Sequence, residues 1–405
     1  MTQRILVIGA GFAGTWSALA SARLLDMAGR TDVEIVLVAP EPHLHIRPRL
    51  YEKNPGGMKA PLKQLFDTVG VQFIQGRVAH IDVEHKMVTI ADLDAETPHG
   101  AISYDRLVLA AGSRLFSPPI PGIQEHAFNV DQIADAVKLE AHLDGLASRP
   151  ATVSRNTVVV AGAGFTGIET AAEMPSRLRE ILGENADVRV IMVERNDAIG
   201  PDLGPGPRPV ITQALQELGV TWKLGSGVAN IDANGVTLEN GERIDADTVI
   251  WTAGARANTL TAQIPAERDA FGRLHVDANL KVIGLDAVYA TGDCARATTT
   301  DGGDKPTMMA CQHAISLGRS AGHNVAADLI GEAPIPYNQP KYVTCLDLGP
   351  WGAVYTEGWD RQVVLQGAQG KKLKTEINTQ WIYPPSNATR AQALASADPR
   401  QAVVA

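Results

Sequence analysis

The sequence predicts an α/β protein in which two similar β-α-β units precede a small β-rich region. Three observations predict this fold class. The pattern GxGxxG occurs twice, at 9–14 and at 162–167. Each copy follows an apolar, β-branched run and opens a helix-forming run, which is the order of strand, turn and helix. Beyond 331 the chain instead alternates polar and apolar residues over short stretches, as antiparallel strands do.

Composition limits the class of protein and its partners. The chain has 405 residues, of which 45% are apolar and 20% charged, and its formal net charge is −9. A globular chain of this length forms two or three domains. Because phosphate backbones require a basic surface, the acidic balance argues against nucleic acid as a partner.

Cysteine spacing and hydropathy give an expectation for location. Cys294, Cys311 and Cys345 form no CxxC pair, so a redox dithiol of that spacing is absent from the sequence. Few cysteines fit a reducing compartment, and we expect a cytoplasmic protein. The apolar stretch 5–22 is alternatively a signal peptide or a short membrane span, but its glycines at GxGxxG spacing have another explanation. No other stretch has about 20 apolar residues, the length that a membrane helix requires.

The first unit is predicted from a strand at 5–8, a helix that continues to Met27, and a second strand at 33–38. In such a loop the first glycine makes the tight turn and the second lets the backbone approach a pyrophosphate. The third glycine lets helix and strand pack closely, and the free N–H groups of the helix favour phosphate. The residues predicted to hold a nucleotide here are Gly9, Gly11, Phe12, Ala13 and Gly14.

The second unit repeats this order. We predict a strand at 157–161, a helix from about Ile168, and a strand at 188–193 that ends at Glu194. One GxGxxG is a weak signal, but two copies in the same context predict two dinucleotide sites. The residues predicted for the second site are Gly162, Gly164, Thr166, Gly167 and Glu194.

The residue after the second strand distinguishes the two sites. A carboxylate there accepts a hydrogen bond from a ribose 2′-OH and repels a 2′-phosphate. Glu194 has this place in the second unit, whereas Ala39 has it in the first. Glu41, two residues further on, is either a replacement for that acid or a solvated turn residue. We therefore expect atypical adenosine binding in the first unit.

The remaining segments complete the two units. Runs at 104–113 and 247–254 are predicted to close the two sheets, and a turn-rich linker at 118–122 joins the units. A strand at 288–290 leads to Asp293 in a turn of small residues. We further predict a helix at 307–330, a small antiparallel sheet at 335–383 and a short helix in the tail.

Several of these motifs together resemble those of a known superfamily. The two glycine loops, Ala-Ala-Gly-Ser at 110–113 and Thr-Gly-Asp-Cys-Ala at 291–295 resemble those of the glutathione-reductase-like flavoproteins with two dinucleotide-binding folds. The resemblance covers roughly 3–330. Within the superfamily the chain is most similar to type II NADH dehydrogenases, the single-subunit NADH:quinone oxidoreductases. The segments that carry this similarity are 43–51, 162–169, 249–254 and 311–318.

The sequence also departs from that family. Gln312 matches the first Gln of the family's AQxAxQ helix, but Ser316 stands in place of the second. Ala39 replaces the usual acid, and Ala111 replaces the commoner Thr. The tail at 387–405 lacks Trp, Phe and Lys and has no strong apolar face, which weakens the expectation of a peripheral membrane contact.

The resemblance implies two Rossmann-like dinucleotide-binding domains. The FAD-binding domain would be discontinuous, with segments 1–120 and 256–330, and 121–255 would form the NAD(P)H-binding domain. Residues 331–405 would be a β-rich region with a tail. The implied cofactors are FAD and NADH, with NADPH as an alternative because Arg195 lies next to Glu194.

The resemblance also implies roles for individual residues. Asp293 would hold the ribitol or pyrophosphate part of FAD, and Glu169 would lie between nicotinamide and flavin. Gln312 would bind a quinone carbonyl. A helix beginning near Thr307 would direct its N-terminus at the flavin pyrimidine. The other residues that the resemblance assigns to cofactor binding are Arg47, Val78, Ala111, Gly112, Ala253, Gly254 and Ala310.

Each role has a simpler alternative. Asp293 is alternatively a turn or N-cap residue, and Glu169 a first-turn residue favoured by the helix dipole. Gln312 is alternatively a capping or solvent-facing amide. No metal site is predicted, because His43, His45 and His313 lack a matching set of Cys or carboxylate ligands.

The expected activity is hydride transfer from NADH to FAD, followed by electron transfer to a quinone or another small acceptor. Two alternatives stay open: a ferredoxin- or rubredoxin-type reductase, and an apoptosis-inducing-factor-like protein that senses NADH. Sulfide:quinone oxidoreductases share the fold but need paired cysteines beside the flavin, which the cysteine spacing does not support. A homodimer is a further expectation.

Overall fold

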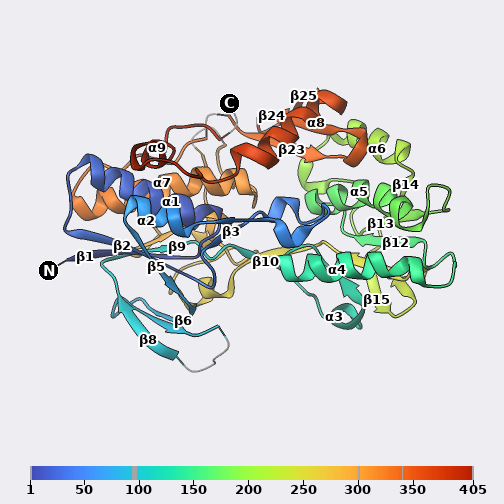
Figure 1. Cartoon of the computed structure of the whole chain (residues 1–405), viewed down its shortest axis with the longest axis horizontal. Coiled ribbons are helices and arrows are strands. Elements are labelled where there is room, and N and C mark those ends of the chain that lie inside the picture. The colour runs from blue at the N-terminus through green and yellow to red at the C-terminus, as the bar shows by residue number, and fades with distance from the viewer. Residues whose placement is uncertain (1, 94–97, 300–301, 340, 404–405) are drawn as a thin grey trace.

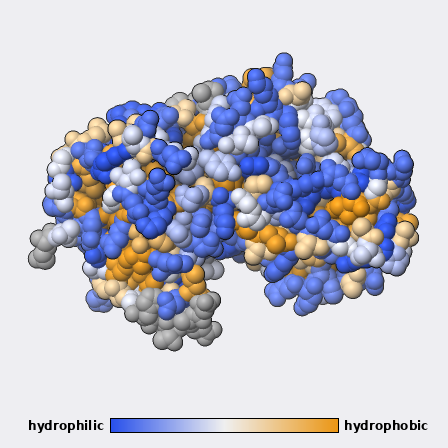
Figure 2. Space-filling view, viewed as in Figure 1, coloured by the Kyte–Doolittle hydropathy of each residue, from blue (hydrophilic) through white to orange (hydrophobic). Residues whose placement is uncertain are grey.

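The computed structural model describes residues 2–93, 98–299, 302–339 and 341–403. Its two largest sheets have five strands each, and helices pack against them (Figure 1). On the face shown in Figure 2, polar residues predominate and apolar residues form smaller areas between them. The α-helices are α1 (Phe12–Met27), α2 (Lys63–Val69), α3 (Ile123–His126), α4 (Ile133–Gly145), α5 (Phe165–Leu182), α6 (Arg208–Glu217), α7 (Cys311–Ile330), α8 (Gly367–Glu376) and α9 (Arg390–Ala395).

The first large sheet belongs to the first unit, and its strands are all parallel. Ile5, Leu6 and Val7 are completely buried, because one face of this sheet packs on α1 and α7 and the other on short strands that include Val78 and Val88. This burial explains the continuous apolar run in the sequence. The strand order is β21 (Val288–Ala290), β9 (Arg106–Leu109), β1 (Gln3–Ile8), β2 (Val33–Ala39) and β5 (Val71–Gln75).

The second large sheet repeats that arrangement and confirms the predicted second unit. All its strand pairs are parallel. The helix α5 begins at Phe165, three residues before the predicted start, because the glycine loop itself supplies its first turn. The strand order is β11 (Ala127–Phe128), β18 (Thr248–Trp251), β12 (Thr157–Ala161), β13 (Arg189–Glu194) and β14 (Val220–Leu224).

Two chain crossings connect the units. β10 (Ser113–Leu115) leaves the first unit, β19 (Ala255–Ala257) returns to it, and the two strands pair antiparallel. After the return, β21 joins the first sheet. These connections support, as a proposal, the discontinuous domain division that we expect from the sequence.

Short strands form several smaller sheets beside the large ones. One such sheet lies between β5 and β9 in the chain. Two of them have three strands: one consists of β6 (Arg77–Asp82), β7 (Met87–Ala91) and β8 (Pro98–Ser103), and the other of β15 (Val228–Asp232), β16 (Gly235–Leu238) and β17 (Arg243–Asp245). The two-stranded sheets include β3 (His43–His45) with β4 (Lys59–Pro61), and β20 (Leu274–His275) with β22 (Ala295–Arg296).

The C-terminal region is only partly the predicted sheet. β23 (Val343–Asp347), β24 (Ala353–Glu357) and β25 (Gln362–Gln366) form an antiparallel sheet. The expectation of strands as far as 383 is wrong, because α8 and a π-helix at Ile377–Trp381 follow β25. The expected tail helix is present as α9, and a capping box of Thr389 and Gln392 satisfies its N-terminal amides.

The sequence predicts a helix that begins near Thr307, but α7 begins at Cys311. The Thr307 amide donates to the carbonyl of Ala297, and Arg273 donates to the carbonyl of Thr307, so this residue is held in extended backbone. The helix packs closely on α1, since a Cβ at Gly318 would lie 2.4 Å from the Ala13 carbonyl oxygen. Its first turn therefore lies beside the first glycine loop.

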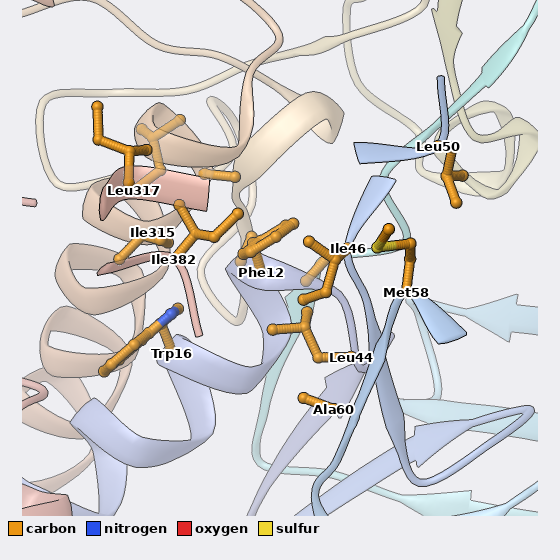
Figure 3. Packing of buried hydrophobic residues seen from close by; sticks show 14 of the residues in the cluster. Phe12, Trp16, Leu44, Ile46, Leu50, Met58, Ala60, Ile315, Leu317 and Ile382 are labelled. Atoms are coloured by element: carbon orange, nitrogen blue, oxygen red, sulfur yellow. The ribbon is translucent and has the colours of Figure 1, made fainter. Parts of the chain in front are cut away.

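A buried apolar cluster supports this corner of the molecule. Phe12 of α1 lies between Leu44 and Ile46 on one side and Ile315 and Ile382 on the other (Figure 3). Four distant segments of the chain therefore meet beneath the first loop. Among the described residues, no helix has the length and apolar character needed to cross a membrane.

Candidate cofactor site and active site

One cavity of about 540 Å³ connects the two units. Its lining includes the first glycine loop, the segment after β3 and the first turn of α7. Trp251 and Thr252 of the second unit, and Cys345 and Lys374 of the C-terminal region, complete it. The predicted site residues that line the cavity are Gly9, Gly11, Phe12, Ala13, Glu41, Arg47, Ala111, Gly112, Thr166, Glu169, Asp293, Ala310 and Gln312.

The remaining predicted residues lie outside the lining of this cavity. Val78 is buried in a separate apolar cluster behind the first sheet. Gly14 packs inside the first loop, as described below. The other predicted residues belong to the second loop, its strand ends and the strand that closes the second sheet: Gly162, Gly164, Gly167, Glu194, Ala253 and Gly254.

The two glycine loops have the geometry that a nucleotide diphosphate requires. A Cβ at Gly14 would lie 1.8 Å from the carbonyl oxygen of Gly9, and the corresponding distance for Gly167 and Gly162 is 1.9 Å. In contrast, a Cβ at Gly11 would have no described heavy atom of its surroundings within 4 Å. The middle glycine therefore faces open space, at the N-terminus of a helix with no side-chain cap among the described residues. This cradle fits a phosphate group.

The acid after the second strand is present only in the second unit. Glu194 is 7% exposed, and its Oε2 accepts a hydrogen bond of 2.8 Å from the amide of Ala163. Its Oε1 accepts from the backbone N and the side-chain Nδ2 of Asn196, at 3.0 and 2.6 Å. Asn196 is not predicted from the sequence, because an Asn after a strand is ordinarily a turn residue.

In the first unit Glu41 takes a different position. Its Oε2 lies 3.6 Å from Nδ1 of His43 and 3.7 Å from Nε2 of His45, and almost half of its side chain is exposed. Burial lowers the pKa of His45, while Glu41 acts in the opposite direction. Ala39 has no side-chain acceptor for the loop amides, so the contact that Glu194 makes in the second unit has no counterpart at this position of the first.

Asp293 lies in a chain of polar contacts along the cavity. The hydroxyl of Ser113 donates to its Oδ2 at 2.7 Å, and Arg47 Nη1 lies 3.4 Å from that hydroxyl. Arg47 also forms an ion pair with Asp131. The family resemblance predicts Arg47 and Asp293 as site residues but not Ser113 or Asp131, because residues so far apart in the chain give no common pattern.

Glu169 forms a buried ion pair in the cavity wall. Its Oε1 accepts from Lys374 Nζ at 2.8 Å and from the amide of Asp347 at 3.0 Å. Its position excludes the alternative of a first-turn residue, since α5 begins four residues earlier, at Phe165. Burial raises the pKa of Glu169 to about 7, and Lys374 partly opposes this. Burial by itself lowers the pKa of Lys374, but the nearby carboxylate of Glu169 raises it, and the net pKa of Lys374 is raised.

Gln312 is buried and faces β23. Its Nε2 donates to the carbonyl of Val343 and lies 3.3 Å from Nε2 of His313. The alternative of a solvent-facing amide is therefore wrong. His313 stacks on Tyr342 with 4.6 Å between ring centres, and burial lowers its pKa to about 4. It is a neutral residue of the core at neutral pH.

The three cysteines are thiols at neutral pH. Burial raises the pKa of Cys311 to about 11 and those of Cys294 and Cys345 to about 12. A thiolate is the reactive form in disulfide and sulfide chemistry, so these side chains are poor nucleophiles.

Comparison with known proteins agrees with this geometry. The model of the pyridine nucleotide-disulphide oxidoreductase family matches residues 3–318. An NADH dehydrogenase-like protein of Mycobacterium tuberculosis is 47% identical over 98% of both chains. A demethylphylloquinone reductase of Synechocystis is 30% identical, over 87% of this chain and 86% of its own. The structure of NDH2 from Plasmodium falciparum in complex with NADH superimposes with a TM-score of 0.79 and 15% identity, over 98% of this chain and 97% of that one.

The chain belongs to the pyridine nucleotide-disulphide oxidoreductase family. The predicted fold class, with two Rossmann-like units, is thereby confirmed. So is the resemblance to NADH dehydrogenases of type II. The protein is an oxidoreductase of a flavoprotein family that uses FAD and a pyridine nucleotide.

Proposed function

We propose that this protein transfers a hydride from NADH to FAD and then passes the electrons to a quinone-type acceptor. One observation carries the proposal: a single cavity extends from the first glycine loop to Thr166 and Glu169 of the second unit. Two nucleotides bound to the two loops would therefore meet in one space. Bound FAD supplies the hydride acceptor and the relay of electrons.

The first unit is the proposed FAD site. Gly9, Gly11 and the uncapped start of α1 suit the diphosphate, and the carboxylate of Asp293 accepts hydrogen bonds from hydroxyl groups. The first turn of α7, with Ala310 as its N-cap, also opens into the cavity. The positive end of its dipole favours negative charge on a reduced cofactor.

The second unit is the proposed NADH site. The remaining acceptor positions on Glu194 Oε2 suit a ribose hydroxyl, and its charge repels a 2′-phosphate. Arg195 next to it is exposed and turned to solvent, so it offers NADPH only a weak counter-charge. We therefore propose NADH as the preferred coenzyme.

Glu169 is proposed to lie between nicotinamide and flavin, and Gln312 to bind a quinone carbonyl. Together with Lys374, Glu169 is further proposed to serve the acceptor step. Quinone reduction consumes protons, and a carboxyl group with a pKa near 7 exchanges a proton readily at neutral pH. The name of the Synechocystis relative, a demethylphylloquinone reductase, supports a quinone as acceptor. The thiols, whose pKa values lie well above neutral pH, do not favour sulfide chemistry. Peripheral membrane contact and a homodimer stay predictions.

The test begins with reduction of the protein in the absence of oxygen, and each acceptor is then mixed in separately. NADH or NADPH is added to the purified yellow protein, and reoxidation by quinones, oxygen, ferricyanide and iron–sulfur proteins is followed by stopped flow. Rapid reoxidation by soluble quinones is expected. If quinones reoxidise the protein no faster than oxygen does, the quinone assignment is wrong; preference for an iron–sulfur protein would point to a ferredoxin-type reductase.

A further inference from the structure

Arg47 lies between two carboxylates and is anchored on one of them. Its Nη2 pairs with Oδ1 of Asp131, and its Nε donates to the backbone carbonyl of Asp131 at 3.1 Å. The distance from its Nη1 to Oδ2 of Asp293 is 3.9 Å. The Ser113 hydroxyl contacts both groups, at 3.4 Å from Nη1 and 2.7 Å from Oδ2. The guanidinium thus makes its close contacts with Asp131 and only a longer ion pair with Asp293.

Asp131 is itself firmly placed. It lies just before α4, and its side chain is 13% exposed. Its Oδ2 accepts from the Leu115 amide at 3.1 Å and from Gln132 Nε2 at 2.7 Å. Its own amide donates to Oδ1 of Asn129 at 3.0 Å. Because Leu115 belongs to the crossing strand β10, this carboxylate is fixed at the junction of the two units.

We propose that Asp131 is a positioning residue for FAD. By binding Arg47, it keeps the guanidinium at 3.9 Å from the Asp293 carboxylate and not at direct hydrogen-bond distance. Acceptor positions on that carboxylate are thereby left free for FAD hydroxyl groups. Arginine keeps its charge at every working pH, so without Asp131 the guanidinium turns to the next carboxylate, which is Asp293. This inference rests on the proposed role of Asp293.

The experiment measures FAD affinity. FAD is removed from the protein, and the apoprotein is titrated with FAD while the quenching of flavin fluorescence is followed. Asp131→Asn is expected to raise the dissociation constant about tenfold, the scale on which one charged contact changes binding. Asp131→Glu should restore most of the affinity. Asp135→Asn, in the first turn of α4 beside Lys138, is the matched control and should leave the affinity unchanged.

A double-mutant cycle separates positioning from loss of structure. In an Arg47→Met background there is no guanidinium to release, so Asp131→Asn should change FAD affinity less than twofold. An equal loss of affinity in both backgrounds would overturn the inference. Thermal melting of each apoprotein reports whether the variants fold.

A third variant separates this inference from the one on which it rests. Asp293→Asn should itself weaken FAD binding. If Asp293→Asn binds FAD as tightly as the wild type, the proposed role of Asp293 is wrong and the inference goes with it. If it binds FAD weakly while Asp131→Asn does not, only the role of Asp131 is wrong.

Discussion

At the scale of single residues, three acids with similar chemistry have different surroundings and therefore different proposed roles. Glu194 accepts a hydrogen bond from a backbone amide of the second loop. Glu169 is buried against an ammonium group. Asp293 accepts from a hydroxyl group and lies near a guanidinium. The first arrangement suits selection between coenzymes, the second proton exchange and the third recognition of hydroxyl groups.

The role of Glu194 predicts a change in coenzyme preference. Glu194→Ala removes the repulsion of a 2′-phosphate, so the ratio of kcat/KM for NADH to that for NADPH should fall about tenfold or more. Steady-state kinetics with both coenzymes measure the ratio. Glu242→Ala removes an exposed carboxylate from the same unit and serves as control. An unchanged ratio in Glu194→Ala would remove this residue from the site.

The pKa of Glu169, about 7, predicts a pH dependence of the quinone step. Its carboxyl group carries a proton below this pKa and loses it above, so the reoxidation rate should fall roughly tenfold between pH 6 and pH 8. Glu169→Gln should be slow and independent of pH over this range. Stopped-flow reoxidation of the reduced protein by a quinone measures this rate.

Two controls accompany that measurement. Ferricyanide accepts electrons without protons, so its rate should not follow the pKa of Glu169. Glu173→Gln, one turn further along α5, should keep the pH profile of the wild type. A profile that survives in Glu169→Gln would show that another group supplies the proton.

At the scale of elements, the two glycine loops do equivalent work in two sheets. In each loop the outer glycines are required by packing, whereas the middle glycine, Gly11 or Gly164, faces open space. Within each six-residue loop, the outer glycines therefore serve packing and the middle glycine is available for a ligand. The close packing of α7 on α1 likewise requires glycine, at Gly318 and Gly322.

This separation predicts two matched variants. Gly11→Ala should keep the melting temperature of the apoprotein but lose FAD, because its methyl group occupies the phosphate cradle. Gly164→Ala should keep FAD and lose affinity for NADH. Flavin content and NADH titration measure the two effects. Loss of both ligands in either variant would contradict two independent loops, and Gly14→Ala should destabilise the protein itself.

At the scale of the whole molecule, the cavity exists because two sheets and the C-terminal region meet around it. Arg47 and Asp131 join the first unit to the start of α4, and Lys374 joins α8 to α5. These contacts connect parts that the chain order keeps separate. Ligand binding between them should therefore stabilise the molecule as a whole.

Added FAD should accordingly raise the melting temperature of the apoprotein. At a free concentration 100 times the dissociation constant, the free energy of unfolding rises by about 2.7 kcal/mol, which corresponds to a few degrees. Differential scanning calorimetry measures the shift. Riboflavin, which lacks the adenosine diphosphate part, should give a much smaller one. Equal shifts with both compounds would show that the first loop contributes little to binding.

Local patterns made most of the fold and part of the site predictable. Repeated spacing of glycines and runs of apolar residues identified both units, since strands, tight turns and helix starts depend on residues close together in the chain. The same patterns failed where tertiary contacts decide. Thr307 resembles the start of a helix but is held extended by Ala297 and Arg273. The segment at 367–376 is expected to belong to the small sheet but forms α8, which packs on that sheet.

The α/β class, the two glycine loops and the acid that distinguishes the second loop from the first all follow from local patterns in the sequence. Tertiary structure alone decided the partners of these residues. Lys374 stands 205 positions from Glu169, and Asp131 stands 84 positions from Arg47. A charge pair across such a distance leaves no periodic trace in the chain, because it depends on how whole elements pack and not on the conformation of neighbouring residues.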